Sequence, residues 1–204
     1  MQRTIDAYNS DPRTLVIVAH PNLAGASRVH RRWAQELEKH PAEFVVHDLY
    51  AAIPQAQQGT AAFDEGVTAA ERDLVVRHKT VVYQFPVYWY SCPALLRTWV
   101  DSVYGFGWAY GGEGALPGEP GRALAGKLFA LAVSAGDEEA SYRAGGAVGF
   151  TVDEVLAPFR ATANYVGARS APHAFALFGT EKGRLSDERL GKSATSYLAW
   201  LRGL

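Results

Sequence analysis

The sequence predicts an α/β fold in which a parallel, five-stranded sheet is covered by helices on both faces. Short runs of apolar, largely β-branched residues recur along the chain, as expected for strands that are buried on both faces. Segments with a helical spacing of apolar residues alternate with these runs, which is the order that parallel strands joined by right-handed crossovers require. The length of 204 residues suits one domain rather than two.

The first half of this fold follows a polar segment, residues 1–13, that has neither helical nor strand periodicity. We expect that segment to be an N-terminal arm and residues 14–204 to form the single domain. Ser27 is a good N-cap for the first helix, and Thr68-Ala69-Ala70-Glu71 is a capping-box pattern for the second. The elements expected in this half are strands at 14–19 and 44–48 and helices at 27–41 and 68–78.

The second half contains three more expected strands. Pro86 ends the first of them, because proline cannot donate a hydrogen bond inside a sheet. Residues 105–126 are rich in glycine and proline and too long for an ordinary connection, which favours a functional or mobile excursion. The elements expected here are strands at 79–85, 128–133 and 174–178 and helices from Pro93 to Val103, at 151–165 and from Ser186 onward.

Composition excludes several classes of function. The net charge of -1 gives no electrostatic reason to expect nucleic acid or an anionic membrane as a partner. No apolar run approaches the roughly 20 residues of a membrane-spanning helix. The single cysteine, Cys92, and the absence of a leader of signal-peptide type indicate a cytoplasmic protein. The histidine spacings match no metal-ligand motif, so no metal is expected.

Parallel α/β sheets bind ligands outside the carboxyl ends of their strands. The first loop at that edge, His20 to His30, combines a glycine, Ser27 and a helix start, which favours binding of a phosphate. This loop lacks both the G-x-G-x-x-G and the P-loop patterns, and Ser27 could equally well serve only as a helix cap.

Two further loops are expected at the same edge. Tyr88, Trp89 and Tyr90 follow the third strand, where their rings could stack on a planar ligand or could instead pack in the core or in a dimer interface. The stretch from Ser134 to Asp137 follows the fourth strand and offers a hydroxyl and open backbone amides. Three loops that converge are a stronger indication of a ligand site than any one of them.

Four stretches resemble a known family: AHPNL at 19–23, SRVH at 27–30, FPVYWYSCPALLRTWVD at 85–101 and GWAYG at 107–111. They are similar to the flavodoxin-like NAD(P)H:quinone oxidoreductases, which include the DT-diaphorases and the small quinone reductases that partner glutathione-gated potassium efflux systems. The resemblance covers roughly residues 14–202. It implies a flavodoxin-like fold, with the sheet in the order 2-1-3-4-5, and two-electron, ping-pong reduction of quinones by NAD(P)H.

The resemblance also implies the site. It assigns the flavin phosphate and ribityl chain to the first loop, the isoalloxazine ring to the second, and the polar edge of the ring to the third, with Tyr142 as a catalytic hydrogen-bond donor. The cofactor is expected to be FMN, with FAD as the alternative, and family members are homodimers in which 105–126 is our candidate to complete the partner's site. The residues assigned to the cofactor are His20, Ser27, Arg28, Val29, His30, Pro86, Val87, Tyr88, Trp89, Tyr90, Ser134, Ala135, Gly136 and Asp137.

This chain departs from the family pattern at three positions. His30 stands where the family usually has asparagine, and Asp137 replaces a glycine. Ala147 occupies the place of a histidine that better-studied members are proposed to use with the tyrosine. We therefore expect phosphate contacts and proton handling to differ from those of the better-studied members.

Two other functions are compatible with the sequence. Ala132 to Gly136 is a one-residue variant of the G-x-S-x-G elbow, with Asp153 and His173 downstream in an order that suits a serine hydrolase using Ser134. A flavin-binding regulatory subunit of a transport system is the other alternative, because fold and function are separable.

Overall fold

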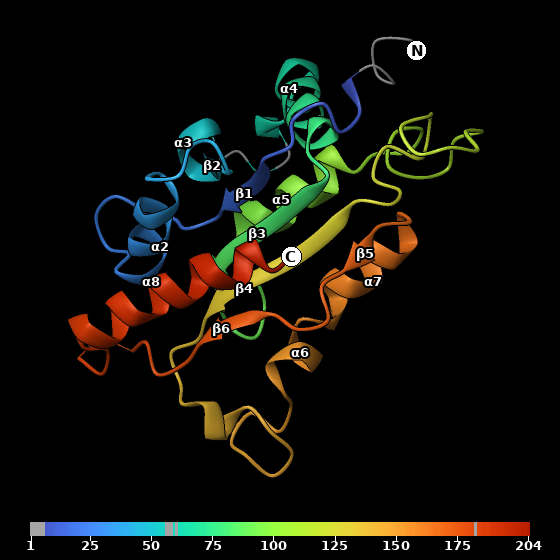
Figure 1. Ribbon diagram of the computed structural model, residues 1–204. Helices are drawn as coiled ribbons and strands as arrows, with labels where there is room; N and C mark the ends of the chain where they lie inside the picture. Colours follow the sequence, from blue (N-terminus) through green and yellow to red (C-terminus); the bar gives the residue numbers. More distant parts are fainter. Residues whose placement is uncertain (1–6, 56–58, 60, 182) are drawn as a thin grey trace.

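The computed structural model describes residues 7–55, 59, 61–181 and 183–204, and it contains one parallel sheet (Figure 1). The sheet runs in the order β2-β1-β3-β4-β5, and β6 also pairs with β4. This arrangement confirms the expected flavodoxin-like order. The strands are β1 (Thr14–Val18), β2 (Phe44–Asp48), β3 (Thr80–Pro86), β4 (Leu128–Ser134), β5 (Arg169–Ser170) and β6 (Phe175–Leu177).

The fifth strand position is filled by two short segments rather than one. Arg169 in β5 pairs with Leu128 at the start of β4, whereas Leu177 in β6 pairs with Ser134 at its end. The sequence predicted only the second of these segments, because β5 has just two residues and no apolar run. Between β5 and β6 the regular strand pairing is broken, so backbone N–H groups there need other hydrogen-bond acceptors.

Helices cover both faces of the sheet (Figure 1). Residues of α2 and α8 belong to one apolar cluster, and residues of α3, α4, α5 and α7 belong to another on the opposite face. The helices are α2 (Val29–Leu37), α3 (Leu49–Ala52), α4 (Glu65–Arg77), α5 (Ala94–Val103), α6 (Val152–Val155), α7 (Ala157–Tyr165) and α8 (Asp187–Arg202), and η2 (Glu139–Ser141) is a short 3₁₀ turn.

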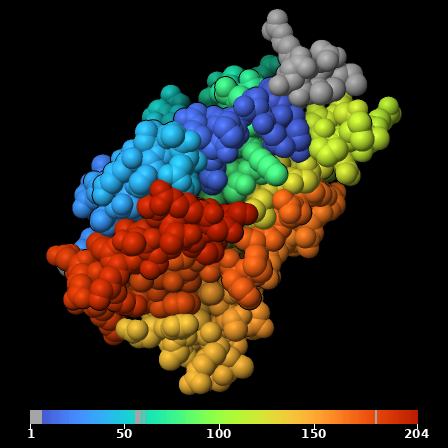
Figure 2. Space-filling view, viewed as in Figure 1, coloured from blue at the N-terminus to red at the C-terminus, as the bar shows by residue number. Residues whose placement is uncertain are grey.

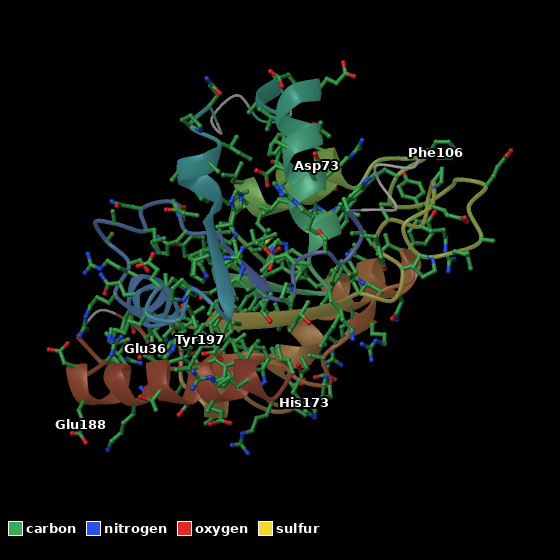
Figure 3. All side chains as sticks on the ribbon, turned by 45° about the horizontal axis from the view of Figure 1, so that its top comes forward. Glu36, Asp73, Phe106, His173, Glu188 and Tyr197 are labelled. Atoms are coloured by element: carbon green, nitrogen blue, oxygen red, sulfur yellow. The ribbon has the colours of Figure 1, made fainter. Side chains whose placement is uncertain are left out.

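The α2–α8 face is built around two large aromatic side chains. Trp33 and Tyr197 are fully buried, with ring centroids 4.8 Å apart, and Trp33 Nε1 donates to Ser193 Oγ over 3.0 Å. Figure 3 shows Tyr197 pointing from α8 into the interior, and Figure 2 shows α2 and α8 forming one continuous surface. Burial of large apolar side chains is worth roughly 1.5–3 kcal/mol each, so this contact fixes α2 against α8.

On the opposite face, a buried carboxylate links α4 to its neighbours. Glu71 accepts hydrogen bonds from Trp99 Nε1 over 2.8 Å and from His47 Nε2 over 3.1 Å. The expected capping box beginning at Thr68 is therefore wrong. The helix begins at Glu65, and the Asp64 carboxylate caps it by accepting from Val67 N over 2.8 Å.

The expected helix at 151–165 is divided into α6 and α7. The first of these begins where the sequence predicts, and Thr151 and Glu154 form a capping box at its start. The division falls at Leu156, two residues before Pro158. Proline lacks the N–H that a continuous helix would need at that position.

Residues 1–6 of the expected N-terminal arm lie outside the described residues. The part of the arm that is described lies against the end of α4, where Asn9 N donates to Val76 O over 3.0 Å and Asp11 N to Arg77 O over 2.9 Å. Asn9 Oδ1 also accepts from Lys127 Nζ, a buried ammonium group that donates to Val76 O and to His78 O as well.

The excursion at 105–126 contains no helix or strand element, and it lies at the amino end of β4 (Figure 1). Its two halves approach closely: a Cβ on Gly112 would lie 2.2 Å from Pro120 O, so only glycine fits there. Phe106 projects from this segment (Figure 3). Within one chain, the excursion is at the opposite end of the sheet from the loops that follow β1, β3 and β4.

Candidate functional site

The loop after β1 is organised by Asn22. Its backbone oxygen accepts from Ala26 N and Ser27 N over 3.1 Å each, and its Oδ1 accepts from Gly25 N over 2.9 Å. Asn22 N donates to His20 Nδ1 over 3.1 Å, so the neutral His20 ring carries its proton on Nε2. Burial lowers the pKa of His20, which favours this neutral donor.

The start of α2 follows at once. Ser27 Oγ accepts from His30 N over 3.2 Å, so the hydroxyl caps the first turn as the sequence predicts. The other N–H groups of the first turn have no partner within the helix, as at any helix start, and together with the positive end of the helix dipole they favour an anion. This end of the loop suits a phosphate group.

The loop after β3 is a tight turn with an unusual backbone. Tyr88 N donates to Ser91 O over 2.9 Å, and Ser91 N donates back to Tyr88 O over 3.0 Å. The two central residues, Trp89 and Tyr90, have φ of +45° and +60°. Glycine or asparagine normally occupies such positions, and a bulky residue there costs about 1–2 kcal/mol. Because the Trp89 side chain is 93% exposed, no core packing offsets this cost. Such strain is typical of functional sites.

The loop after β4 lies beside this turn. Ser134 pairs with Pro86, and Val87 N donates to Ser134 O over 2.8 Å. Ala135 is tied to the loop after β6, because its oxygen accepts from both N and Oγ1 of Thr180. The carboxylate of Asp137 accepts a hydrogen bond from Glu138 N, which lowers the pKa of Asp137. This side chain is therefore an anion at neutral pH.

A cleft of about 520 Å³ lies where these loops meet. Eight of the predicted residues line it, whereas Val87, Trp89, Tyr90 and the stretch Ala135 to Asp137 do not. Four lining residues were missed: Ala26, Thr180, Gly183 and Leu185. Three of these follow the fifth strand position, so the rule that ligands bind at carboxyl ends could have found them. The predicted residues in the lining are His20, Ser27, Arg28, Val29, His30, Pro86, Tyr88 and Ser134.

Arg28 lines the cleft and also joins two helices. Its guanidinium donates to Leu185 O over 2.8 Å and to Asp187 Oδ1 over 2.6 Å. The side chain therefore joins the start of α2 to the start of α8 and closes one wall of the cleft.

Tyr142 lies beyond the lining of the cleft, at the end of η2. Its ring centroid is 5.2 Å from that of Phe178, and the residue is buried. Burial raises the pKa of the Tyr142 phenol, and the neighbouring Tyr90 and Asp137 raise it further. The phenol is therefore a protonated hydrogen-bond donor throughout the neutral pH range.

The structure does not assemble the residues of the serine hydrolase alternative. Ser134 Oγ is 2.9 Å from His30 Nε2, and the described residues place no carboxylate on the other nitrogen of that ring. Asp153 instead pairs with His173, whose Nδ1 lies 2.8 Å from Asp153 Oδ2. These two residues line a separate, small cavity beside β5 and β6.

The described part of the chain has neither a metal-binding cluster nor a membrane-spanning helix. No three His, Cys, Asp or Glu side chains are grouped as a metal site would require. No helix in those residues is long and apolar enough to cross a membrane.

The strand order and the three-loop cleft define a flavodoxin-like protein. Comparison with known families agrees: a family model for the flavodoxin-like fold matches residues 12–201. The chain belongs to this family.

Two bacterial relatives cover nearly the whole chain. An uncharacterized NAD(P)H oxidoreductase, YrkL, of Bacillus subtilis is 42% identical over 93% of this chain and 98% of the relative. The glutathione-regulated potassium-efflux system ancillary protein KefG of Serratia proteamaculans is 35% identical over 94% of this chain and 93% of the relative.

Two solved structures are also similar. General stress protein 14 from Treponema denticola, in complex with FMN, is 43% identical, with a TM-score of 0.79, over 94% of this chain and 99% of that one. An NADPH-quinone reductase from P. pentosaceus is 29% identical, with a TM-score of 0.75, over 94% of this chain and 99% of that one.

Proposed function

We propose that this chain is an NAD(P)H oxidoreductase that binds FMN and reduces quinones or similar acceptors. The main structural support is the cleft itself, which is lined by the start of α2 and by Tyr88 of the strained aromatic turn. The NAD(P)H oxidoreductase and the FMN-bound structure among the relatives support the same assignment.

The residues present fit the phosphate of a flavin. Around the start of α2 the cleft offers His20 as a neutral donor, the Ser27 hydroxyl and free helix N–H groups. Asp187, the carboxylate at this wall, is already paired with Arg28, so it does not repel an anion. A dianionic phosphate suits this donor set, because helix starts bind anions without a dedicated lysine.

The second and third loops would hold the ring of the flavin. The turn from Tyr88 to Ser91 presents aromatic surface, and the backbone from Gly136 to Asp137 is exposed beside it. Because a Cβ on Gly136 would meet nothing within 4 Å, the space over this backbone is open. We assign Pro86 to Tyr90 and Ser134 to Asp137 to the ring.

Bound flavin supplies two-electron transfer between a reduced nicotinamide and a quinone-like acceptor. The protein positions both substrates and stabilises charge. Tyr142, protonated and held against Phe178, is the residue that we expect to donate a hydrogen bond at the reacting end. The exposed Trp89 and Tyr90 rings would pack on the substrates and exclude water from them.

We propose that the working form is a homodimer in the cytoplasm. A groove of about 550 Å³ between α5 and α7 is lined by Arg97, Asp101, Tyr110 and Tyr165 among others, and Phe106 is exposed on the neighbouring excursion. Phe106 and Tyr165 are both exposed, and exposed aromatic residues grouped on one surface are typical of interfaces. The excursion is distant from the cleft of its own chain, so it could complete only a partner's site. The proposed location in the cytoplasm is supported by the single cysteine, because disulfides are rare in that reducing compartment and one cysteine cannot form a disulfide within the chain.

The direct test is the visible spectrum of the purified protein, followed by mass determination of the cofactor that heat releases. We expect FMN in near-stoichiometric amount and NAD(P)H-dependent reduction of a soluble benzoquinone. Protein that neither retains nor takes up FMN or FAD would contradict the proposal. Release of FAD alone would preserve the function but replace the cofactor.

A second candidate is a flavin-binding regulatory subunit of a transport system, because the relative from Serratia proteamaculans is an ancillary protein of potassium efflux. Both candidates require the same cleft. They differ in turnover: rapid quinone reduction by the isolated protein supports the enzyme, and flavin binding without turnover supports the regulator.

A further inference from the structure

One wall of the cleft contains a histidine that is almost completely buried. His30 is 1% exposed, and its ring lies between His20 and Trp33, with centroid distances of 5.8 Å and 5.4 Å. Its backbone is fixed as well, since its N–H donates to Ser27 Oγ and its oxygen accepts from Gln84 Nε2 over 3.1 Å. The imidazole therefore has little freedom to turn.

This ring makes a single hydrogen bond among the described residues. His30 Nε2 lies 2.9 Å from Ser134 Oγ, whereas its Nδ1 is buried without a partner. The Ser134 hydroxyl likewise has no other described partner. One proton must lie between the two groups, and its position decides what Ser134 can offer to a molecule in the cleft.

Two arrangements are chemically available. If Ser134 donates, a buried N–H is left without an acceptor at Nδ1, close to the positive end of α2. If His30 donates from Nε2, only a lone pair is left at Nδ1, and His30 lies in the first turn of α2, where the helix dipole favours negative rather than positive charge. Orphaned buried N–H groups are rarer in proteins than under-satisfied acceptors, which favours the second arrangement.

We propose that His30 is a positioning residue that donates from Nε2 to Ser134 Oγ and so directs the Ser134 hydroxyl proton into the cleft. This inference rests on the proposed flavin function. The serine hydroxyl then donates a hydrogen bond to an acceptor atom of the bound cofactor, since its own lone pair is occupied by His30. A serine without this neighbour could equally well present a lone pair, which would repel a phosphate or carbonyl oxygen.

The position of the proton can be measured directly in the native protein. Long-range ¹H–¹⁵N correlation spectra distinguish the two neutral tautomers of histidine, and the His30→Gln variant assigns the signals of His30. In the flavin-free protein at neutral pH we expect the proton on Nε2 and none on Nδ1. A proton on Nδ1, or on both nitrogens, would overturn the inference.

A double-mutant cycle on FMN affinity tests the consequence. We expect His30→Phe and Ser134→Ala each to weaken FMN binding about tenfold, as loss of one hydrogen bond predicts, and the double variant to be no weaker than either. The His30→Gln variant can place an amide donor near the position of Nε2, so it should bind FMN within about threefold of the native chain. Additive losses, or failure of glutamine to restore binding, would contradict the inference.

The same titrations separate this inference from the proposed function. If the native chain binds no flavin, the proposed function fails while the tautomer measurement still stands. If the native chain binds FMN but the cycle shows no coupling, the function stands and the role of His30 fails. Urea unfolding of each flavin-free variant shows whether a loss of affinity is a loss of fold.

Discussion

The hydroxyl of Tyr142 can be tested without disturbing the packing around it. Replacement by phenylalanine keeps the ring against Phe178 and removes only the donor. One neutral hydrogen bond contributes about 1 kcal/mol, so we expect oxidation of the reduced flavin by quinone to slow roughly five- to tenfold. Stopped-flow measurement of both half-reactions gives the answer. Equal rates for the variant and the native chain would remove Tyr142 from the mechanism.

His30 makes the stability of the fold depend on pH. Burial, with a smaller effect of His20, lowers its pKa from 6.5 to about 3. Between these values the unfolded chain binds a proton that the folded chain excludes, so stability falls as the pH drops. The slope for one such group approaches 1.4 kcal/mol per pH unit, as a rough upper value.

We expect urea unfolding to show this loss in the native chain below about pH 6.5, and the His30→Gln variant to show a shallower decline. The difference between the two chains removes the effect of the other titrating groups, which are common to both. Parallel curves from pH 6.5 to 4 would mean that His30 is protonated in the folded state.

Among the elements, the turn at Tyr88–Ser91 lowers the stability of the folded chain, because Trp89 and Tyr90 have positive φ. Asparagine tolerates positive φ, whereas alanine does not, and both remove the indole of Trp89. We expect the flavin-free Trp89→Asn variant to be about 1 kcal/mol more stable than Trp89→Ala by urea unfolding, and both to bind the acceptor more weakly. Equal stability would show that the backbone of this turn is not strained.

Asp153 has a structural role at the break between β5 and β6. Its Oδ1 accepts from Ala174 N over 3.1 Å and from Arg160 over 3.0 Å, and its Oδ2 faces His173. Hydrogen bonds to charged groups contribute about 1.5–3 kcal/mol, so Asp153→Ala should lower the free energy of unfolding by about 2 kcal/mol.

The matched control is Asp153→Asn, which keeps Oδ1 and should lose less than half as much. Neither change should affect quinone reduction beyond its effect on folding, since both residues of the pair lie outside the cleft. A specific loss of turnover in a stable Asp153→Asn protein would contradict this structural role.

These elements show where sequence patterns succeed and fail. The long buried strands were predictable because parallel strands are apolar on both faces, and β1 to β4 begin and end within one residue of the expected bounds. The two residues of β5 have no such pattern, and the cap at Asp64 was missed because Thr68 to Glu71 imitates a capping box. There the buried contact of Glu71 with Trp99, a tertiary effect, decides the side chain's role.

For the molecule as a whole, the site was predictable in position but not in detail. The rule on carboxyl ends placed the three loops together because β1, β3 and β4 are neighbours in the sheet. Thr180 and Leu185 follow the fifth strand position and fall under the same rule, but the pairing of Arg28 with Asp187 depends on how α8 packs against α2. No local pattern in the sequence specifies that packing.

The proposed dimer is a prediction at this same scale, and Tyr165 is the residue at which to test it. This side chain is 73% exposed, packs on Tyr110 at a centroid distance of 5.4 Å, and lines the groove between α5 and α7. We expect sedimentation velocity at micromolar concentration to show a dimer for the native chain and predominantly monomer for Tyr165→Arg, because a charge buried at an apolar contact costs several kcal/mol.

The matched control is Leu204→Arg, which adds the same charge at an exposed apolar residue just after α8 and should leave the dimer intact. If the excursion at 105–126 completes the partner's flavin site, Tyr165→Arg should also weaken FMN binding even though Tyr165 does not line the cleft of its own chain. A monomeric variant with native FMN affinity would show that each cleft is complete within one chain. A native chain that sediments as a monomer would contradict the dimer itself.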